Sequence, residues 1–415
     1  APMPVFVTDG GRFIAFDADS DGRAVFGEEA YVFAFDSCPR SLRIQTGGSY
    51  EELAGFTAAN VPNRQYIPEW CMDGMILGVQ GGTQTVLDKT FAMLDAGAKI
   101  CGVWSQDWSG ENRTVMGKQV WWNWEADEKL YPELRGAIEK LRARGVRFLT
   151  YINPYLVKGS RLYEQCAAAG YLIRRQDGSI YHIKSTTFDA GMLDLTNPEA
   201  VRFTKDVLIK KNMLDLGVSG WMADFGEYLP ADCVCFGGSG LEMHNKWPML
   251  WAKCNREAVE EAGLLGDCVF FMRAGAAGSQ KYSTLLWAGD QCVDWSEDDG
   301  LPSVITSALT AGMSGFGLPT CDAGGYTTLF GLHRDEELLL RWLEFTCFSP
   351  VMRTHEGNRP DDNIQLYSSR EIINRAARLS HIHTALLPYL KVCVEENAEQ
   401  GIPVMRPLFY DAPHC

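Results

Sequence analysis

The sequence of 415 residues has little positive charge: 38 Lys and Arg stand against 53 Asp and Glu, which gives a net charge of −15. Nucleic acids and anionic membrane surfaces are bound through positive charge, so we expect neither as a partner. The first residues also lack the pattern of a signal peptide or a membrane anchor. The missing signal, together with a cysteine pattern typical of reduced thiols, favours a cytoplasmic protein, and the sequence leaves its oligomeric state open.

The 13 cysteines lack the spacing of a metal site. Cys233 and Cys235 form the one close pair, and no second pair follows them as a zinc site requires. Several others lie in apolar runs, where cysteine behaves as a small hydrophobe. His381 and His383 are two positions apart in a helical pattern and therefore lie on different faces. We expect reduced thiols and no metal site.

The chain has no repeat of fixed short period, which argues against a solenoid. Strands and helices instead alternate from about residue 76 onward. The expected strands are 76–80, 100–105, 146–152, 218–223, 268–272, 284–288, 314–318 and 346–352. The expected helices are 84–96, 132–145, 197–215, 244–262, 299–312, 334–345 and 370–398. Eight such units over about 320 residues predict an α/β fold, a (β/α)8 TIM barrel with insertions.

Two acids stand where strands of this barrel end. The segment WMADFGEYLP ends an apolar run in Asp224, and LLWAGD ends another in Asp290. Active sites of such barrels form at the carboxyl ends of the strands, so these acids can meet. Two carboxylates in different surroundings are the working pair of glycoside hydrolysis. An Asp after a strand is also a common helix cap or turn residue, and that alternative stays open here.

Other polar and aromatic residues follow the same strand ends. Trp104, Asp107 and Trp108 follow one strand, Arg273 follows another, and His355 follows the last. We expect all of them at the rim of the barrel. Glu227, three residues after Asp224, either orients a neighbour or binds a sugar hydroxyl. The 12 Trp suit a flat, partly apolar ligand such as a sugar.

Four segments, WMADFGEYLP, FMRAGAAGSQKYSTLLWAGDQCVDWSEDDG, GGYTTLF and MRTHEGNRP, resemble the catalytic barrel of glycoside hydrolase family 31, and more narrowly its bacterial sulfoquinovosidase branch. The resemblance runs from about Trp104 to Pro407. It implies retaining hydrolysis of a small α-glycoside without a metal or organic cofactor. It also implies that Asp224 is the nucleophile and Asp290 the general acid/base. The residues implied to hold the sugar hydroxyls are Asp107, Arg273 and His355.

The branch binds the sulfonate on carbon 6 of sulfoquinovose through a polar set that this sequence keeps only in part. Gln106, Trp122 and Tyr326 match that set, but Gln119 stands where the branch has an Arg. A hydrogen bond to a charged group contributes about 1.5–3 kcal/mol, against about 0.5–1.5 kcal/mol for a neutral one. Lys118 and Arg113 are nearby cations that either compensate or remain ordinary surface charges.

Three functions therefore stay open. The first is a sulfoquinovosidase, and the second is an α-glucosidase or α-xylosidase, which Gln119 favours. The third is an inactive carbohydrate-binding fragment, because both chain ends look cut. By the resemblance, we expect residues 1–70 to be the C-terminal part of an N-terminal β-sandwich domain. The barrel would then span 71–400, and 401–415 would begin a truncated C-terminal β domain.

Overall fold

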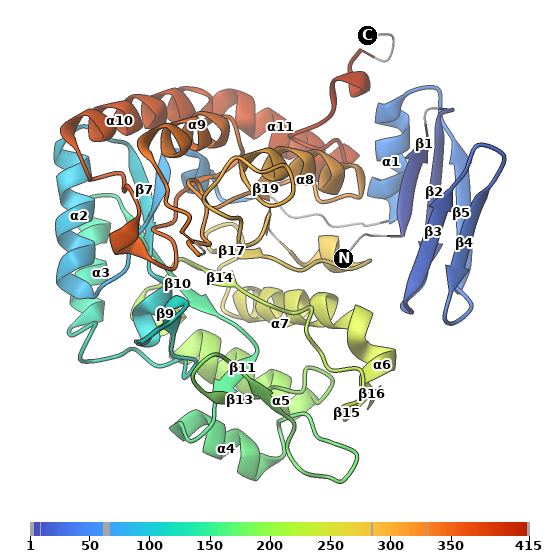
Figure 1. Ribbon diagram of the computed structural model, residues 1–415, viewed down its shortest axis with the longest axis horizontal. Coiled ribbons are helices and arrows are strands. Elements are labelled where there is room, and N and C mark those ends of the chain that lie inside the picture. The colour runs from blue at the N-terminus through green and yellow to red at the C-terminus, as the bar shows by residue number, and fades with distance from the viewer. Residues whose placement is uncertain (1–3, 9, 61–66, 284, 330, 413–415) are drawn as a thin grey trace.

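Eight parallel strands form the barrel at the centre of the protein (Figure 1). The computed structural model describes residues 4–8, 10–60, 67–283, 285–329 and 331–412. In spatial order the barrel strands are β20 (Met352–Arg353), β6 (Met75–Gly78), β7 (Ile100–Trp104), β10 (Arg147–Ile152), β14 (Gly220–Ala223), β17 (Val269–Met272), β18 (Leu285–Trp287) and β19 (Pro319–Thr320). A parallel bridge between Ala323 and Thr354 closes the circle beyond the last two strands. The predicted (β/α)8 barrel is confirmed.

Helices surround the barrel, and their apolar faces explain their positions. In α3 the residues Leu134, Ala137, Ile138 and Leu141 are buried, as helical spacing predicts. The helices that follow or cover the strands are α2 (Thr83–Asp95), α3 (Leu134–Ala143), α5 (Pro198–Phe203), α7 (Trp247–Glu261), α8 (Leu301–Met313), α9 (Glu336–Cys347), α10 (Arg370–Ala385) and α11 (Leu387–Gln400). Within the described ranges, no helix combines the length and apolarity needed to cross a bilayer.

The prediction was wrong in detail at the last two strands. The apolar run 314–318 precedes the strand, which is Pro319–Thr320. Most of the run 346–352 belongs to the end of α9 and the turn after it, and only Met352–Arg353 is strand. A short apolar run cannot distinguish a buried strand from a buried helix end by periodicity. The helix expected at 370–398 is two helices that meet at Leu386.

The N-terminal residues form a separate strand-rich layer, coloured blue in Figure 1. Its strands are β1 (Val5–Thr8), β2 (Arg12–Asp17), β3 (Gly22–Phe26), β4 (Tyr31–Phe35) and β5 (Ser41–Thr46). Strands β1, β2 and β5 form one antiparallel sheet, and β3 and β4 form a hairpin. Helix α1 (Tyr50–Asn60), which the sequence did not predict, packs Tyr50 on Phe409 with 4.6 Å between ring centroids. The assignment of this layer to a β-sandwich domain stays a prediction.

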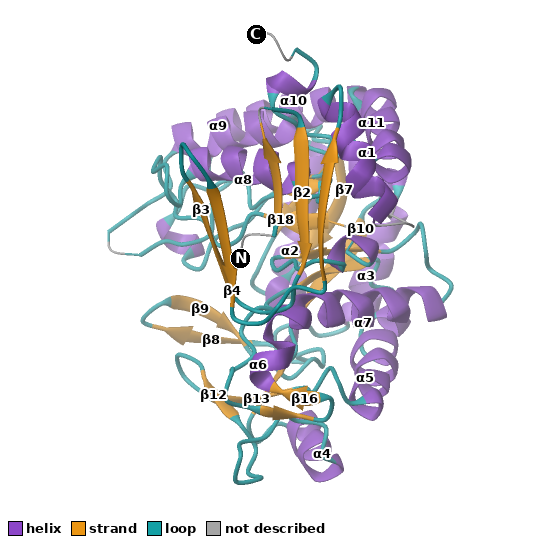
Figure 2. Cartoon of the chain, turned by 90° about the vertical axis from the view of Figure 1, so that its right-hand side faces the viewer, coloured by secondary structure: helices purple, strands orange, loops and turns teal. Residues whose placement is uncertain are grey.

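Insertions after the barrel strands build the walls above the barrel mouth. They are the hairpin of β8 (Glu111–Thr114) and β9 (Gly117–Val120), the sheet of β11 (Tyr155–Val157), β12 (His182–Lys184) and β13 (Asp189–Met192), the helix α4 (Arg161–Ala169), the short pair β15 (Val234–Cys235) and β16 (Gly238–Ser239), and the helix α6 (Gly240–Met243). Figure 2 shows the β8–β9 hairpin beside the β12–β13 hairpin. These two hairpins form one side of the site.

Candidate active site

A cavity of about 700 Å³ opens at the carboxyl ends of the barrel strands. Its volume suits a monosaccharide glycoside, since small-molecule pockets typically measure about 300–1,000 Å³. The residues predicted from the sequence that line it are Gln106, Gln119, Trp122, Asp224, Asp290, Tyr326 and His355. Arg273 contacts Asp224 and Asp290, and Asp107 is the buried neighbour of Gln106 in the chain. The structure therefore brings together every predicted site residue, with two exceptions among the rim aromatics.

Trp104 and Trp108 are those exceptions, because both lie in the core. Each indole is almost fully buried. Trp104 donates to the carbonyl of Thr354 at 2.9 Å, and Trp108 donates to the carbonyl of Tyr151 at 2.7 Å. Their indoles donate to backbone carbonyls of neighbouring segments, so the expectation that these two aromatics lie at the rim of the barrel was wrong.

Asp224 occupies a sharp turn directly after β14. Its carboxylate accepts hydrogen bonds from the hydroxyl of Tyr151 and from the backbone N–H of Phe225, the latter at 2.7 Å. Phe225 has a φ of 59° and Gly226 a φ of 106°, so the chain turns through the left-handed region immediately after the acid. Residues with a Cβ rarely adopt this backbone conformation. At position 226 glycine has no Cβ that would clash with the backbone. The turn aims the carboxylate into the cavity.

Arg273 joins the acids of the site. Its guanidinium donates to Glu227 at 2.8 Å and to Asp290 at 3.1 Å, and it lies 3.4 Å from Asp224. Burial alone would lower the pKa of Arg273, but these carboxylates outweigh burial and raise it. The expectation that Glu227 orients a neighbour agrees with its bond to Arg273.

The contact with Arg273 also limits the distance between Asp224 and Asp290. The same nitrogen, Nη1, lies 3.4 Å from Asp224 Oδ1 and 3.1 Å from Asp290 Oδ2. The two oxygens can be no farther apart than these two distances together. Carboxyl groups are about 5–5.5 Å apart in retaining glycosidases and about 6.5–9.5 Å apart in inverting ones. The shared nitrogen favours the retaining arrangement.

Asp290 has the environment of a proton donor. It lies three residues beyond β18, and 44% of its side-chain surface remains open to the cavity. Desolvation by the walls of the barrel mouth, followed by the charge of Asp224, raises the pKa of Asp290 to about 7, although Arg273 acts in the opposite direction. A carboxyl group with this pKa is still protonated in a large share of molecules near neutral pH.

Asp107 is held rigidly behind the cavity wall. One carboxylate oxygen accepts from the hydroxyl of Tyr131, and the other accepts from the backbone N–H of Gly81 at 2.8 Å. Burial raises the pKa of Asp107 to about 6, and these two hydrogen bonds limit the rise. With both oxygens engaged, the Asp107 carboxylate has a fixed orientation.

Gln106 and His355 contact each other on the opposite side of the cavity from Asp224. The distance from Gln106 Oε1 to His355 Nε2 is 3.3 Å, and the ring of Tyr326 lies edge-on to His355 at 4.8 Å between centroids. Burial, together with the charges of Arg353 and Arg334, lowers the pKa of His355 well below its usual value. His355 is therefore neutral at physiological pH.

Trp122 forms an aromatic wall between the two sides. It stacks on Tyr155 with 5.1 Å between centroids and meets the ring of Phe225 edge-on at 5.5 Å. Phe225 in turn lies under the guanidinium of Arg273, 4.5 Å from its ring centroid. This wall connects the acid cluster with the β8–β9 hairpin.

Gln119 is engaged with the neighbouring hairpin. Its amide nitrogen donates to the hydroxyl of Ser185, and its oxygen accepts from Thr187 at 2.7 Å. Lys118, beside it, lines the cavity and pairs with Glu111 at 2.9 Å. Arg113 is exposed on the facing strand of the hairpin, while Lys184 is a further cation that lines the cavity.

Several residues of the site were not found from the sequence. Tyr151, which donates to Asp224, is the penultimate residue of β10, and its position near a strand end was a usable signal. Asp322 lines the cavity and forms a fully buried ion pair with Arg353. Asp322 and Arg353 lie at the ends of the two strands whose positions were predicted wrongly, which hid them.

Metal ligands do not gather in the part of the chain that the structure describes, where no group of three or more His, Cys, Asp or Glu is placed to hold an ion. His381 is exposed and contacts the carbonyl of Gly97, whereas His383 is buried and contacts the carbonyl of Cys347. The two histidines of the sequence motif therefore face apart, as their spacing predicts.

The glycosyl hydrolases family 31 TIM-barrel domain matches residues 83–391. With the barrel and the acids at its strand ends, this match shows that the chain belongs to glycosyl hydrolase family 31. The sulfoquinovosidase of Escherichia coli is 48% identical over 98% of this chain and 60% of its own length. The sulfoquinovosidase of Agrobacterium fabrum is 43% identical over 98% of this chain and 62% of its own length.

A solved structure gives the same result for the fold. The family 31 sulfoquinovosidase from E. rectale, in complex with an aza-sugar inhibitor, matches with a TM-score of 0.97 and 45% identity. The match covers 100% of this chain and 62% of that one. The chain thus spans less than two thirds of the length of these relatives.

Proposed function

We propose that this protein is a retaining α-glycoside hydrolase that releases sulfoquinovose from sulfoquinovosyl glycerol or related glycosides. The observation that carries the reaction type is the contact of Asp224 and Asp290 with one nitrogen of Arg273 in the cavity. The similarity to sulfoquinovosidases supports the choice of sugar. The described cysteines are free thiols, which supports a cytoplasmic location.

In the first step, an oxygen of Asp224 attacks the anomeric carbon and the bond to the aglycone oxygen breaks. Asp290 gives its proton to that oxygen, so the aglycone leaves as a neutral alcohol. The pKa of about 7 keeps this proton available. Tyr151 and the N–H of Phe225 hold the Asp224 carboxylate in line for the attack.

In the second step, Asp290 acts as a base. It takes a proton from a water molecule, whose oxygen attacks the anomeric carbon and breaks the bond to Asp224. The sugar leaves with its original configuration, and Asp290 is protonated again. Arg273 stabilises whichever carboxylate carries the charge at each stage, because it contacts both.

The substituent on carbon 6 would lie toward Gln106, Trp122 and Tyr326. These side chains line one side of the cavity, and Gln119 supports that side through its bonds to Ser185 and Thr187. Lys118 lines the cavity and is the cation that we assign to the anionic sulfonate, although its ion pair with Glu111 offsets part of its charge. Asp107, Arg273 and His355 hold the ring hydroxyls.

A second sugar remains a candidate because of one observation. Gln119 is neutral, and an uncharged 6-hydroxyl tolerates a neutral amide better than a sulfonate does. If the neutral side chain of Gln119 sets the specificity, the protein is an α-glucosidase or α-xylosidase with the same catalytic acids.

The deciding experiment compares kcat/KM for the 4-nitrophenyl α-glycosides of sulfoquinovose and glucose. We expect a strong preference for the sulfonated sugar, and NMR of the first product formed should detect its α-anomer. A preference for glucose would overturn the sulfonate assignment while leaving the hydrolase intact. No turnover of either glycoside would contradict hydrolysis by this chain and favour a carbohydrate-binding fragment.

A further inference from the structure

The hairpin of β8 and β9 forms one side of the cavity and needs support from outside. It is a sheet of two strands, joined by a turn at Val115 and Met116. A hairpin of two strands is at best marginally stable by itself in water. This hairpin nevertheless places Met116, Lys118 and Gln119 in the cavity wall. The position of the wall therefore depends on the contacts that the hairpin makes with the rest of the protein.

Asn358 makes such contacts at the tip of the hairpin. Its side-chain amide donates to the carbonyl of Met116 at 2.6 Å, and its own carbonyl accepts from the backbone N–H of Lys118 at 2.7 Å. The next residue, Arg359, donates to the carbonyl of Val115. On the hairpin side all three bonds use backbone groups, so they fix the path of the chain at the tip.

The two other polar groups of Asn358 bind a second segment of the cavity wall. Its backbone N–H donates to the carbonyl of Tyr326 at 3.1 Å, and its side-chain oxygen accepts from the N–H of Thr328 at 2.8 Å. Between these two residues, the hydroxyl of Thr327 donates to the carbonyl of Asp290 at 2.7 Å. Asn358 therefore links the hairpin to the segment that contacts the proposed acid.

Position 117 shows how closely the hairpin approaches Asn358. Gly117 has a φ of 100°, and a Cβ at this position would collide with the carbonyl oxygen of Asn358. Glycine therefore permits both the turn and the close approach. Asn358 is only 5% exposed, and a hydrogen bond shielded from water is electrostatically stronger than one in solvent.

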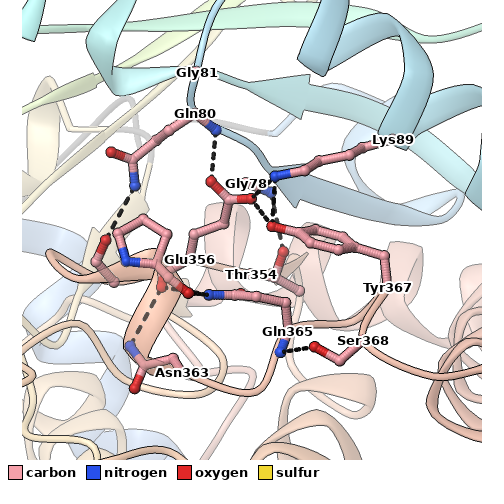
Figure 3. Close-up of polar contacts among 12 residues, drawn as sticks. Gly78, Gln80, Gly81, Lys89, Thr354, Glu356, Asn363, Gln365, Tyr367 and Ser368 are labelled. Carbon is pink, nitrogen blue, oxygen red and sulfur yellow. Dashed lines mark hydrogen bonds and ion pairs between the residues drawn. The ribbon is translucent and has the colours of Figure 1, made fainter.

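The segment that carries Asn358 is itself anchored by Glu356 (Figure 3). This acid is 2% exposed. Its carboxylate accepts from the backbone N–H of Gln80 at 2.7 Å, from Lys89 at 2.8 Å and from the hydroxyl of Tyr367. A buried carboxylate needs such partners, because an unpaired buried charge is costly. If the contact at Asn358 is lost, we therefore expect the hairpin to move rather than this segment.

We propose that Asn358 is a positioning residue that holds the β8–β9 hairpin in place as a wall of the cavity, so that the site has its shape before a sugar binds. A wall that is formed in advance spares the ligand the cost of ordering it. This inference rests on the proposed function for the nature of the ligand. The attachment of the hairpin rests only on the hydrogen bonds of Asn358.

The first test is limited digestion of Asn358→Ala with trypsin. Arg113 and Lys118 lie on the hairpin, and cleavage after either requires the hairpin to open locally. We expect cleavage there to be about tenfold faster than in the unmodified chain. Cleavage after Arg175, which is exposed and lies outside the hairpin, should change by less than about twofold. An unchanged rate at Arg113 and Lys118 would overturn the inference.

The second test measures kinetics with whichever 4-nitrophenyl α-glycoside the unmodified chain hydrolyses. In Asn358→Ala the hairpin would be in place in only a fraction of the molecules, so KM should rise about fivefold. Asp224 and Asp290 lie after β14 and β18 and not on the hairpin, so kcat should change by less than about twofold. Faster cleavage with an unchanged KM, or a raised KM without faster cleavage, would overturn the positioning role.

Asn363→Ala is the matched control. Asn363 is also a buried asparagine, 7% exposed, and its side chain binds Thr328, Arg334 and Arg359, none of which lies on the hairpin. Thermal unfolding should show a similar loss of stability for both variants, while only Asn358→Ala speeds cleavage of the hairpin. If Asn363→Ala speeds that cleavage as much, the effect is general loosening and the positioning role is wrong.

The digestion separates this inference from the proposed function. If the unmodified chain hydrolyses neither glycoside, the proposed function fails and the cleavage rates still decide the role of Asn358. Should Asn358→Ala not fold, Asn358→Asp takes its place, because its carboxylate can still accept from Thr328 but cannot donate to the carbonyl of Met116. The same faster cleavage after Arg113 and Lys118 is then expected.

Discussion

The two sides of the cavity differ in the charge of their polar side chains. Around Asp224 and Asp290 the polar groups are charged and meet at Arg273. On the other side, Gln106 and His355 are themselves neutral and are fixed by hydrogen bonds of defined direction. On the charged side, burial and the charge of Asp224 raise the pKa of Asp290 and keep its proton available for transfer. The neutral side orients donors and acceptors, which is how buried polar groups discriminate between substrates.

This contrast predicts different failures on the two sides. Removing a charge from the acid cluster changes the pKa of Asp290 and affects the chemical step. Removing a neutral group from the other side changes binding of one substituent. The expected effects therefore decrease from the acids to the amides and then to the pH profile.

The largest effect is expected for Asp224→Asn. Asparagine can still accept from the N–H of Phe225 but cannot attack the anomeric carbon, so kcat should fall by at least about 10³-fold. Initial rates with 4-nitrophenyl α-sulfoquinovoside measure this loss, and thermal unfolding checks that the variant is folded. A rate near that of the unmodified chain would remove Asp224 as the nucleophile.

Asp290→Asn should separate good leaving groups from poor ones. An alkyl aglycone such as glycerol needs the proton of Asp290, so kcat/KM for its glycoside should fall by about 10²–10⁴-fold. Nitrophenolate leaves without a proton, and formation of the glycosyl-enzyme from its glycoside should slow far less. Parallel assays with both aglycones make the comparison. Equal losses for the two would contradict the role of Asp290 as the acid.

Gln119→Arg should increase the selectivity for the sulfonated sugar. An arginine there adds a charged, forked donor near the proposed sulfonate position, and we expect the preference for the sulfonated sugar over glucose to rise about tenfold. The ratio of the two kcat/KM values measures it. No gain would mean that residue 119 serves only to hold Ser185 and Thr187.

Lys118→Met and Lys184→Met are the controls for this change. Both lysines line the cavity, but the ammonium of Lys118 pairs with Glu111, whereas the Lys184 side chain is exposed. Loss of sulfonate preference in the first variant alone would identify Lys118 as the compensating cation.

The smallest effect is expected in the pH profile. Burial and Asp224 raise the pKa of Asp290 to about 7, so its proton is present below that pH and lost above it. The value of kcat/KM should fall as pH rises past about 7. Arg273 lowers the pKa of Asp290, so Arg273→Met should move this limb upward by about 1 unit, while Arg273→Lys should leave it near its original position. A limb that does not move in Arg273→Met would contradict the coupling.

The positions of the two catalytic acids could be predicted from the sequence better than those of the residues that orient site side chains by hydrogen bonds. Asp224 and Asp290 directly follow long apolar runs, so their strand-end positions were readable. Tyr151 lies inside such a run and carries no distinctive motif. The contact between Gln106 and His355 joins segments more than 200 positions apart, which no local pattern reveals. Helix α1 was missed because its apolar residues lack helical spacing over a full face.

Phe225 joins the two sides of the cavity and carries a backbone conformation that costs most side chains about 1–2 kcal/mol. Its ring separates Arg273 from Trp122, so the strained residue is also the aromatic floor of the acid cluster. Asparagine, which tolerates this conformation better, would relax the turn and remove that floor in one substitution. For directed evolution, position 225 is therefore a point where selection for heat resistance and selection for turnover are expected to choose different residues.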